Sequence, residues 1–484
     1  MSLTYVGPTI GDGDLIVPAA QEAALDPLLA EALVLLRASE YVGSGDWINE
    51  GTAGGDAVGT PVASDNDVPP VWFSPDDGMG SGLRGLSVRT NEADALSSLF
   101  STPDSVALDI TGDITLRARF MLIPPAFDAP QGVIIRKTVG TGNADYVNSV
   151  WSLVLDENGD LRFNFNTNQN AAVTAGLSNY GYHDVAMDYD SATGDVRAFI
   201  ADPDGELDID GDSFTLIGTN TALSGAALDT SDGPLTFMIA KGFGALAQVF
   251  TGRVGETMVK VAEFDSTDAS GQGDQSWAAG TGETWTAGID SWIIDPDPAG
   301  WWMFPSSAAG AASTFTVADD PAIDLGTSDG TIALWITPTA VATANFSFWI
   351  YAQKASGTVG AGGVGWVFED FKFDGAGLDG FGPFVSDGTD LAIGLHNASW
   401  TANAGHLAVT TLDRDGSLTS YVDGVSRATS SMTAGPGAIG DISTSTGIVI
   451  GSAPQPFAVH AFALYGRVLT PTEATVTLAA SLGA

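Results

Sequence analysis

The sequence contains no cysteine, which excludes disulfide bonds, thiol catalysis and cysteine-ligated metals. Positive charge is also scarce, because 17 Lys and Arg residues stand against 59 Asp and Glu residues and give a formal net charge of -42. A field of this sign repels phosphate groups, so we expect no nucleic-acid binding and no binding to anionic membranes. No apolar run reaches the roughly 18 residues of a transmembrane helix, so we expect no membrane insertion. The first ten residues also lack the basic start of a secretion signal.

What the sequence does contain is typical of a turn-rich, all-β protein. Hydrophobic residues make up 44% of the 484 residues and there are 60 glycines, which suits two domains with real cores and many tight turns. Short alternating runs are separated by Gly, Asp, Asn and Pro. In residues 151–165 the turn contains Asn158-Gly159, and in residues 408–422 it contains Asp415-Gly416, so both segments are predicted hairpins.

The first 40 residues differ from the rest. Residues 19–37 are rich in Ala, Leu and Glu, with apolar residues at helical spacing, and Asp26 before Pro27 is a suitable N-cap. We therefore expect a short N-terminal helical segment. It is either an attachment arm or a helix packed on the first sandwich.

An internal repeat divides the remainder. Residues 105–122 match 321–338, and residues 182–205 match 405–425. Further matches follow in the same order, and 250–264 is aligned with 456–470. The polar stretch 265–276 has the composition of a linker. The repeat predicts an arm over 1–40, a first sandwich over 41–268 and a second over 269–484.

The motifs of the second copy resemble a known family. Residues 420–425 (SYVDGV) and 464–474 (LYGRVLTPTEA) are similar to the central hairpin and closing strand of LamG-like, concanavalin A-like jelly-roll domains. The first copy keeps the order of motifs but lacks the Leu-Thr-Pro tail. The resemblance implies two tandem jelly-roll β-sandwiches. It says little about activity, because this fold carries lectins, glycosidases, adhesion modules and virion parts.

Catalytic motifs are missing. The sequence has no zinc-protease, nucleophile-elbow or phosphate-loop pattern. Related glucanases carry three acids on one strand face, but Glu369 and Asp374 are an odd number of residues apart and would face opposite sides of a strand. His183 and His406 are repeat equivalents at the start of the same strand, where a structural role is expected. We therefore predict that the protein is not an enzyme and requires no cofactor.

One acidic loop is a candidate metal site. Asp202, Asp204, Asp208 and Asp210 lie in the stretch DPDGELDIDGD and offer the hard oxygen ligands that calcium prefers. LamG-like domains often hold calcium at a rim loop, which agrees with this prediction. The alternative is a plain solvated loop.

Aromatic residues are the candidates for ligand binding. Trp366 and Phe371 could form a binding rim or a sheet face, and the sequence leaves both interpretations open. The tryptophans near the start of the second copy repeat at positions equivalent to Trp47 and Trp72, which indicates a structural role.

The leading functional hypothesis is a structural virion protein of a tailed, actinobacterial bacteriophage. It would be a minor tail or host-contact protein on the particle surface, a homo-oligomer that contacts other virion proteins and binds a host cell-surface glycan. Support comes from the acidic, cysteine-free composition and from a resemblance to LamG-type phage tail proteins. The alternatives are a capsid decoration protein and a lectin-like bacterial adhesin.

Overall fold

The computed structural model describes most of the chain. The described residues are 27–40, 47–60, 71–73, 85–87, 100–122, 132–138, 149–156, 158–166, 169–177, 181–201, 214–237, 242–265, 276–287, 291–293, 300–303, 313–339, 347–359, 362–372, 380–394, 401–432, 439–451, 453 and 455–484. Antiparallel strands dominate them, in four sheets. This confirms the predicted all-β sandwich class. No helix in these ranges is long and apolar enough to cross a membrane.

The first sandwich is built from two sheets, which we call sheet C and sheet D. Sheet C runs in the order β13 (Thr215–Asn220), β12 (Val196–Ala201), β11 (Gly181–Tyr189), β6 (Ile114–Leu122), β15 (Gly242–Thr251), β4 (Gly85–Ser87) and β19 (Ser291–Ile293), with β16 (Val259–Asp265) also paired to β15. Sheet D runs in the order β10 (Gln169–Val173), β9 (Leu161–Phe165), β8 (Ser149–Leu155), β7 (Gly132–Thr138), β14 (Leu235–Phe237), β5 (Phe100–Thr102), β18 (Thr284–Ala287) and β17 (Ser276–Ala278).

Alternation along the strands creates the core between these sheets. On β6, Ile114, Leu116 and Ala118 are buried in one apolar cluster with residues of sheet D such as Ile134 and Trp151. The intervening Arg117 and Arg119 face away from that core, as the period of two predicts.

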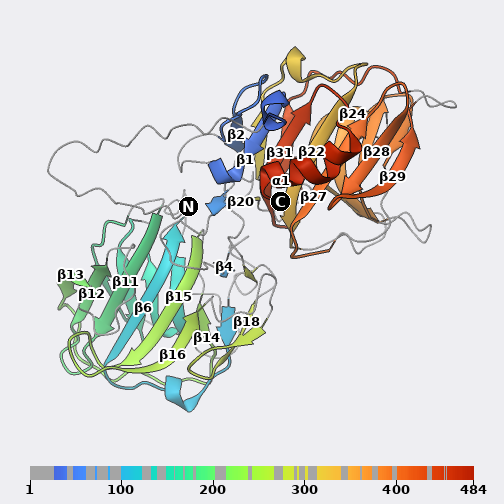
Figure 1. Ribbon diagram of the computed structural model, residues 1–484. Coiled ribbons are helices and arrows are strands. Elements are labelled where there is room, and N and C mark those ends of the chain that lie inside the picture. The colour runs from blue at the N-terminus through green and yellow to red at the C-terminus, as the bar shows by residue number, and fades with distance from the viewer. Residues whose placement is uncertain are drawn as a thin grey trace, which may run out of the picture.

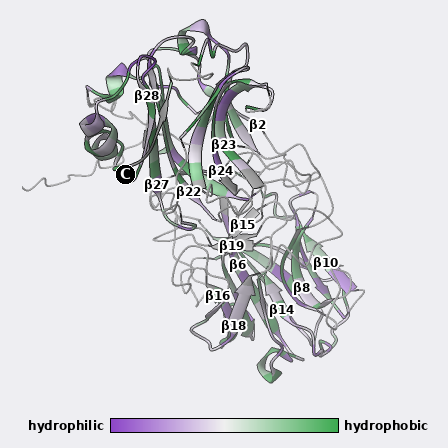
Figure 2. Ribbon diagram, turned by 90° about the vertical axis from the view of Figure 1, so that its right-hand side faces the viewer, coloured by the Kyte–Doolittle hydropathy of each residue, from purple (hydrophilic) through white to green (hydrophobic). Residues whose placement is uncertain are grey.

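The second sandwich repeats this architecture with sheets A and B. Sheet A runs in the order β29 (Val425–Ser431), β28 (Ser417–Val422), β27 (His406–Leu412), β22 (Gly330–Pro338), β31 (Phe457–Tyr465), β20 (Gly300–Met303) and β3 (Val71–Phe73), with β1 (Val34–Arg37) also paired to β31. Sheet B runs in the order β2 (Ala57–Thr60), β21 (Thr314–Val317), β30 (Ile448–Gly451), β23 (Ser347–Ser356), β24 (Val364–Lys372), β25 (Gly380–Asp387) and β26 (Leu391–Ile393). Figure 2 shows β27 and β22 in one layer and β23 and β24 in the other. A second apolar cluster fills the space between them.

Strand order is the same in both sandwiches, which supports the predicted duplication. Each strand of β4–β15 has a counterpart at the same place in β20–β31. Even the short 3-10 turns before β6 and β22 correspond, Val106–Leu108 and Pro321–Ile323. One alignment between the two repeats was wrong in the sequence comparison. The strands β15 and β31 are each followed by a Gly-Arg-Val turn, so residues 252–254 correspond to 466–468. The predicted alignment of 250–264 with 456–470 was therefore shifted along the chain.

The N-terminal strands belong to the second sandwich. β1 pairs along β31, with Leu36 opposite Phe462, and β2 pairs along β21. In Figure 1 these strands, coloured blue, lie among the orange and red strands of the C-terminal half. In the first sandwich the equivalent places are taken by β16 and β18, which come after β15 in the chain. The sheets thus group residues 85–293 in one sandwich and 34–73 with 300–465 in the other, which departs from the division expected from the repeat.

The expected N-terminal helix is only partly present. Residues 19–26 lie outside the described part of the chain, Leu29–Glu31 form a single 3-10 turn, and Val34–Arg37 form a strand. The helix prediction over 34–37 was therefore wrong. Tertiary pairing overrides helix propensity here. β20 pairs with β31 only over 457–459, so residues 461–464 on the same side of β31 are left for the backbone groups of β1.

The outer face of sheet A is covered by both ends of the described chain. Leu28, Leu29 and Leu35 meet Leu478 and Leu482, which lie on α1 (Leu478–Leu482) or at its end, in a third apolar cluster over β31 and β27. A π-helical turn, Glu473–Thr477, leads into α1. The described part of the predicted attachment arm is therefore buried on the second sandwich, and does not pack on the first.

Candidate functional site

The predicted calcium ligands Asp202, Asp204, Asp208 and Asp210 lie outside the described residues. The calcium site therefore stays a prediction. Within the described ranges, no group of three or more His, Asp or Glu side chains is placed to hold a metal ion.

The predicted aromatic ligand residues sit on β24. Trp366 is only 2% exposed and stacks on Phe462 of the opposite sheet, with ring centroids 6.1 Å apart and planes 15° apart. A ligand could reach this ring only if the core opened, so its place in the structure is that of a core residue. Phe371 lies further along the same strand, and its side chain is outside what the structure describes.

Other tryptophans lie in the two cores. Trp285 and Trp277 pack against Phe264 in the first sandwich. Trp47 and Trp301 meet 6.1 Å apart in the second. Their burial agrees with the structural role that the repeat indicates.

The histidine at the start of β27 secures a turn. His406 Nδ1 lies 2.8 Å from Asp423 Oδ2, and the backbone N–H of Leu407 donates to Asp423 Oδ1. Asp423 and Gly424 both have positive φ, at 51° and 72°, so the Val-Asp-Gly motif provides the left-handed conformation that this turn requires. Both His183 and His406 are buried, in keeping with the structural role expected for them.

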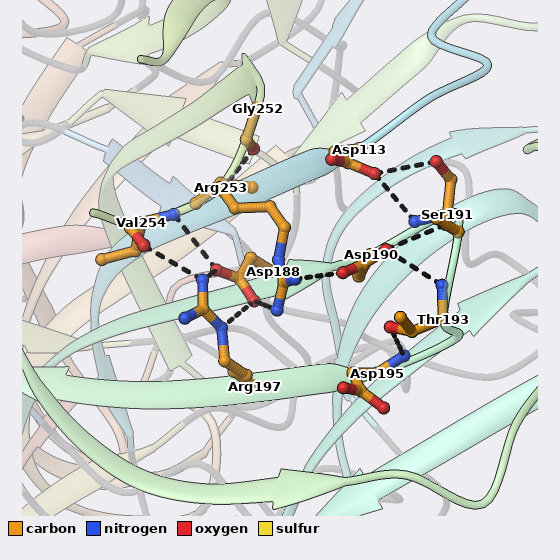
Figure 3. Close-up of polar contacts among 12 residues, drawn as sticks. Asp113, Asp188, Asp190, Ser191, Thr193, Asp195, Arg197, Gly252, Arg253 and Val254 are labelled. Carbon is orange, nitrogen blue, oxygen red and sulfur yellow. Dashed lines mark hydrogen bonds and ion pairs between the residues drawn. The ribbon is translucent and has the colours of Figure 1, made fainter. Parts of the chain in front are cut away.

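A charged network occupies the outer face of sheet C (Figure 3). Asp188 on β11 is fully buried and accepts two hydrogen bonds from the Arg197 guanidinium, at 3.0 and 2.5 Å. Arg253, in the turn after β15, lies 3.6 Å from Asp188 and also pairs with Asp190. The backbone N–H of Val254 donates to Asp188 as well. The carboxylates and guanidinium groups bond to one another, so this cluster fastens the 252–254 turn to the sheet.

The equivalent arginine of the second sandwich fastens the N-terminal segment. Arg467 lies 2.6 Å from Glu31 and 2.9 Å from Glu473. Hydrogen bonds from Arg467 and from the backbone of Thr470 lower the pKa of Glu473 to about 2. The Gly-Arg-Val turn is therefore joined to β11 through Asp188 in the first sandwich, and to the N-terminal 3-10 turn through Glu31 in the second.

One buried carboxyl stands apart from these pairs. Glu369 on β24 is 7% exposed, and it belongs to none of the ion pairs described above. Burial, with a smaller effect from the charge of Asp370, raises the pKa of Glu369 to about 7. Its cross-strand neighbours are Ile350 and Gly382, neither of which is acidic. Asp370, as the next residue, points to the opposite face of the strand.

An open groove runs between the edges of the two sheets in the first sandwich. One wall is residues 172–174, at the end of β10, and the other is residues 217–222, at the end of β13. The volume of the groove is about 450 Å³. β10 is the outermost strand of sheet D, and β13 is the outermost strand of sheet C. A bulge between Ala198 and Phe199 leaves Ile217 outside the regular register of β13. Bulges of this kind are frequent at sheet edges and beside binding sites.

The walls of the groove are joined by a side-chain amide. Asn220 Nδ2 donates to the carbonyl of Ala172 at 2.9 Å, and its Oδ1 accepts from the N–H of Ala222 at 3.0 Å. Gly218 lets the walls approach closely, because a Cβ atom there would lie 2.6 Å from a methyl group of Val173. Sequence reasoning missed this groove, since the strands that form it are not neighbours in the chain.

Comparison with known families gives a match within the second sandwich. Residues 309–475 match the sequence profile of the concanavalin A-like lectin/glucanases superfamily (Laminin_G_3). This agrees with the fold that the Val-Asp-Gly and Gly-Arg-Val motifs predicted. Curated proteins gave no match to the chain.

Solved structures resemble the chain only distantly. The binding domain of Paraclostridial Mosquitocidal Protein 1 is 13% identical, with a TM-score of 0.31 over 38% of this chain and 43% of that chain. The botulinum neurotoxin serotype G binding domain is 14% identical, with a TM-score of 0.30 over 38% of this chain and 43% of that chain. Each match spans less than half of the neighbour's length, and likenesses of this size carry no argument about function.

Proposed function

We propose that the protein binds carbohydrate without cleaving it. The observation that carries this proposal is a contrast within the matched region. The superfamily that matches residues 309–475 includes both lectins and glucanases, whereas Glu369 has no second carboxylate among its cross-strand neighbours. Glycoside hydrolysis generally needs two carboxyl groups about 5–10 Å apart across the sugar. A buried carboxyl without an acidic cross-strand neighbour on its own face of the sheet favours the lectin side of the superfamily.

We further propose that the protein is displayed on the particle of a tailed bacteriophage. It would act as a minor tail or host-contact protein that binds a cell-surface glycan and contacts other virion proteins as a homo-oligomer. The acidic, cysteine-free composition supports this placement. The strand order of β4–β15 is that of β20–β31, so the first sandwich has the same lectin-like fold as the second, and the tandem arrangement supports the placement as well. A capsid decoration protein and a lectin-like bacterial adhesin are the alternatives.

Binding of fluorescently labelled protein to actinobacterial cell envelopes tests the proposal. We expect saturable binding that purified cell-wall glycan competes away, and no release of reducing sugar from a panel of glucans. Repeating the assay with a calcium chelator tests the acidic loop at the same time, since loss of binding on chelation would support the calcium prediction.

The outcomes separate the candidates. Absence of binding to any envelope across a broad host panel would exclude the adsorption role and favour capsid decoration. Turnover of a glucan would contradict the non-catalytic proposal. Cryo-electron microscopy of the producing phage, with the chain located on the tail, the capsid or neither, distinguishes the virion roles from the bacterial adhesin.

A further inference from the structure

We propose that the groove between β10 and β13 is a binding site for a neutral oligosaccharide. This inference rests on the proposed carbohydrate-binding function and gives it a place and a ligand class. The groove lies in the first sandwich, outside residues 309–475 that match the lectin/glucanases superfamily.

The groove offers the groups that hydroxyl-rich ligands need. Thr174, Thr219 and Thr221 line it with exposed hydroxyl groups, which both donate and accept hydrogen bonds as sugar hydroxyls do. Because β10 and β13 are the outermost of the described strands, each also has an edge to which no described strand of its sheet is paired. Backbone N–H and C=O groups along such edges are free to bond a ligand. Ile217, which is partly exposed, adds aliphatic surface for the apolar face of a sugar ring.

Charge selects a neutral ligand. None of the described residues that line the groove is charged, so none of them would pair with a phosphate, sulfate or carboxylate. The formal net charge of -42 disfavours polyanionic glycans further. The lining also provides no carboxylate that could bridge through a cation or attack a glycosidic bond.

Size and rigidity fit a short stretch of glycan. A volume of about 450 Å³ falls within the roughly 300–1,000 Å³ of ligand pockets. The hydrogen bond from Asn220 to Ala172 joins the two walls, and the bond from Ala222 fixes the Asn220 side chain within its own wall. Both are made before any ligand arrives, which reduces the ordering that binding would require. Since the groove is open along the sheet edges, it suits an internal segment of a longer polysaccharide as well as a free end.

Two variants of the full-length protein test the site. Thr219→Ala combined with Thr221→Ala removes two exposed hydroxyls, and Ala172→Phe fills the groove from its other wall. Thr215→Ala is the matched control, because Thr215 is an exposed threonine on the same strand, β13, that does not line the groove. Affinity would be measured by titration calorimetry against neutral gluco-, galacto- and arabino-oligosaccharides and against uronic-acid oligosaccharides of equal length.

We expect one or more neutral oligosaccharides to bind and the uronic-acid series not to bind. The double threonine variant should lose affinity by about 5- to 150-fold, as for two lost hydrogen bonds. Ala172→Phe should abolish binding, and Thr215→Ala should leave it within about two-fold. Circular dichroism and thermal unfolding would confirm that all three variants are folded.

Other results overturn the inference in distinguishable ways. If the wild-type protein binds a neutral sugar and all variants bind it equally, the groove is not the site, but the proposed function stands. If no oligosaccharide binds the wild-type protein, the proposed function itself fails. If an extended peptide binds and the groove variants block it while sugars have no effect, the groove is a strand-addition site, and the sugar inference is wrong.

Discussion

Replacing Leu36 with alanine should destabilise the second sandwich and leave the first unchanged. Leu36 lies on β1, is fully buried in the core between sheets A and B, and stands opposite Phe462 on β31. Leucine-to-alanine changes at such positions cost about 2–5 kcal/mol. At about tenfold for every 1.4 kcal/mol, the opening equilibrium of the second sandwich should rise by about 30- to 4,000-fold.

Hydrogen exchange followed by mass spectrometry can measure this effect separately in each sandwich. Peptides from β22 and β31 should exchange faster in the variant by a factor within that range, whereas peptides from β6 and β15 should not change. Leu116→Ala is the matched control, because Leu116 is equally buried in the first core and should give the reverse pattern. If Leu36→Ala accelerates exchange in the first sandwich, or in neither, then β1 does not belong where the structure places it.

Three further predictions concern the polar and aromatic residues described above. The raised pKa of Glu369 means that its protonated form is favoured in the folded state, so the stability it contributes is present below pH 4.5 and lost as pH rises through about 7. Glu369→Gln should remove this pH dependence of the unfolding free energy, measured by denaturant titration across that window. An unchanged pH profile would contradict the raised pKa. Asp188→Ala leaves Arg197 and Arg253 without their buried partner and should lower the unfolding free energy of the first sandwich by about 3–5 kcal/mol, which urea titration would test; a loss under about 1 kcal/mol would show that the cluster does not fasten the turn. Trp366→Ala should cost about 3–5 kcal/mol of stability yet leave glycan affinity unchanged in the folded fraction, and a selective loss of affinity would restore Trp366 as a ligand residue.

Local patterns carried enough information to predict the sandwich class. The two-residue alternation on β6 and the Asn-Gly and Asp-Gly turns depend on neighbours in the chain, and they are found where the sequence predicts them. The Gly-Arg-Val turn is also a local signal, and its recurrence at Arg253 and Arg467 could have revealed the correct alignment of the closing strands.

Features that depend on distant partners were harder to predict. The composition of Val34–Arg37 favours a helix, and only its pairing with residues 461–464 of β31, more than 400 residues away, makes it a strand. The groove depends on how two sheet edges meet, which no spacing in the sequence records. Trp366 was ambiguous because alternation places a residue on one face of a strand without showing whether that face is the core.

The pairing of β1 with β31 also has a consequence for synthesis on the ribosome. Arg37 pairs with Ala461, so β1 must wait for about 424 further residues before its partner exists. At about 5–20 residues per second, this takes roughly 20–85 s. During that time the first sandwich can fold as it emerges, while an apolar strand remains unpaired and vulnerable to aggregation. A chaperone that holds this nascent segment would therefore be expected to raise the yield of folded protein.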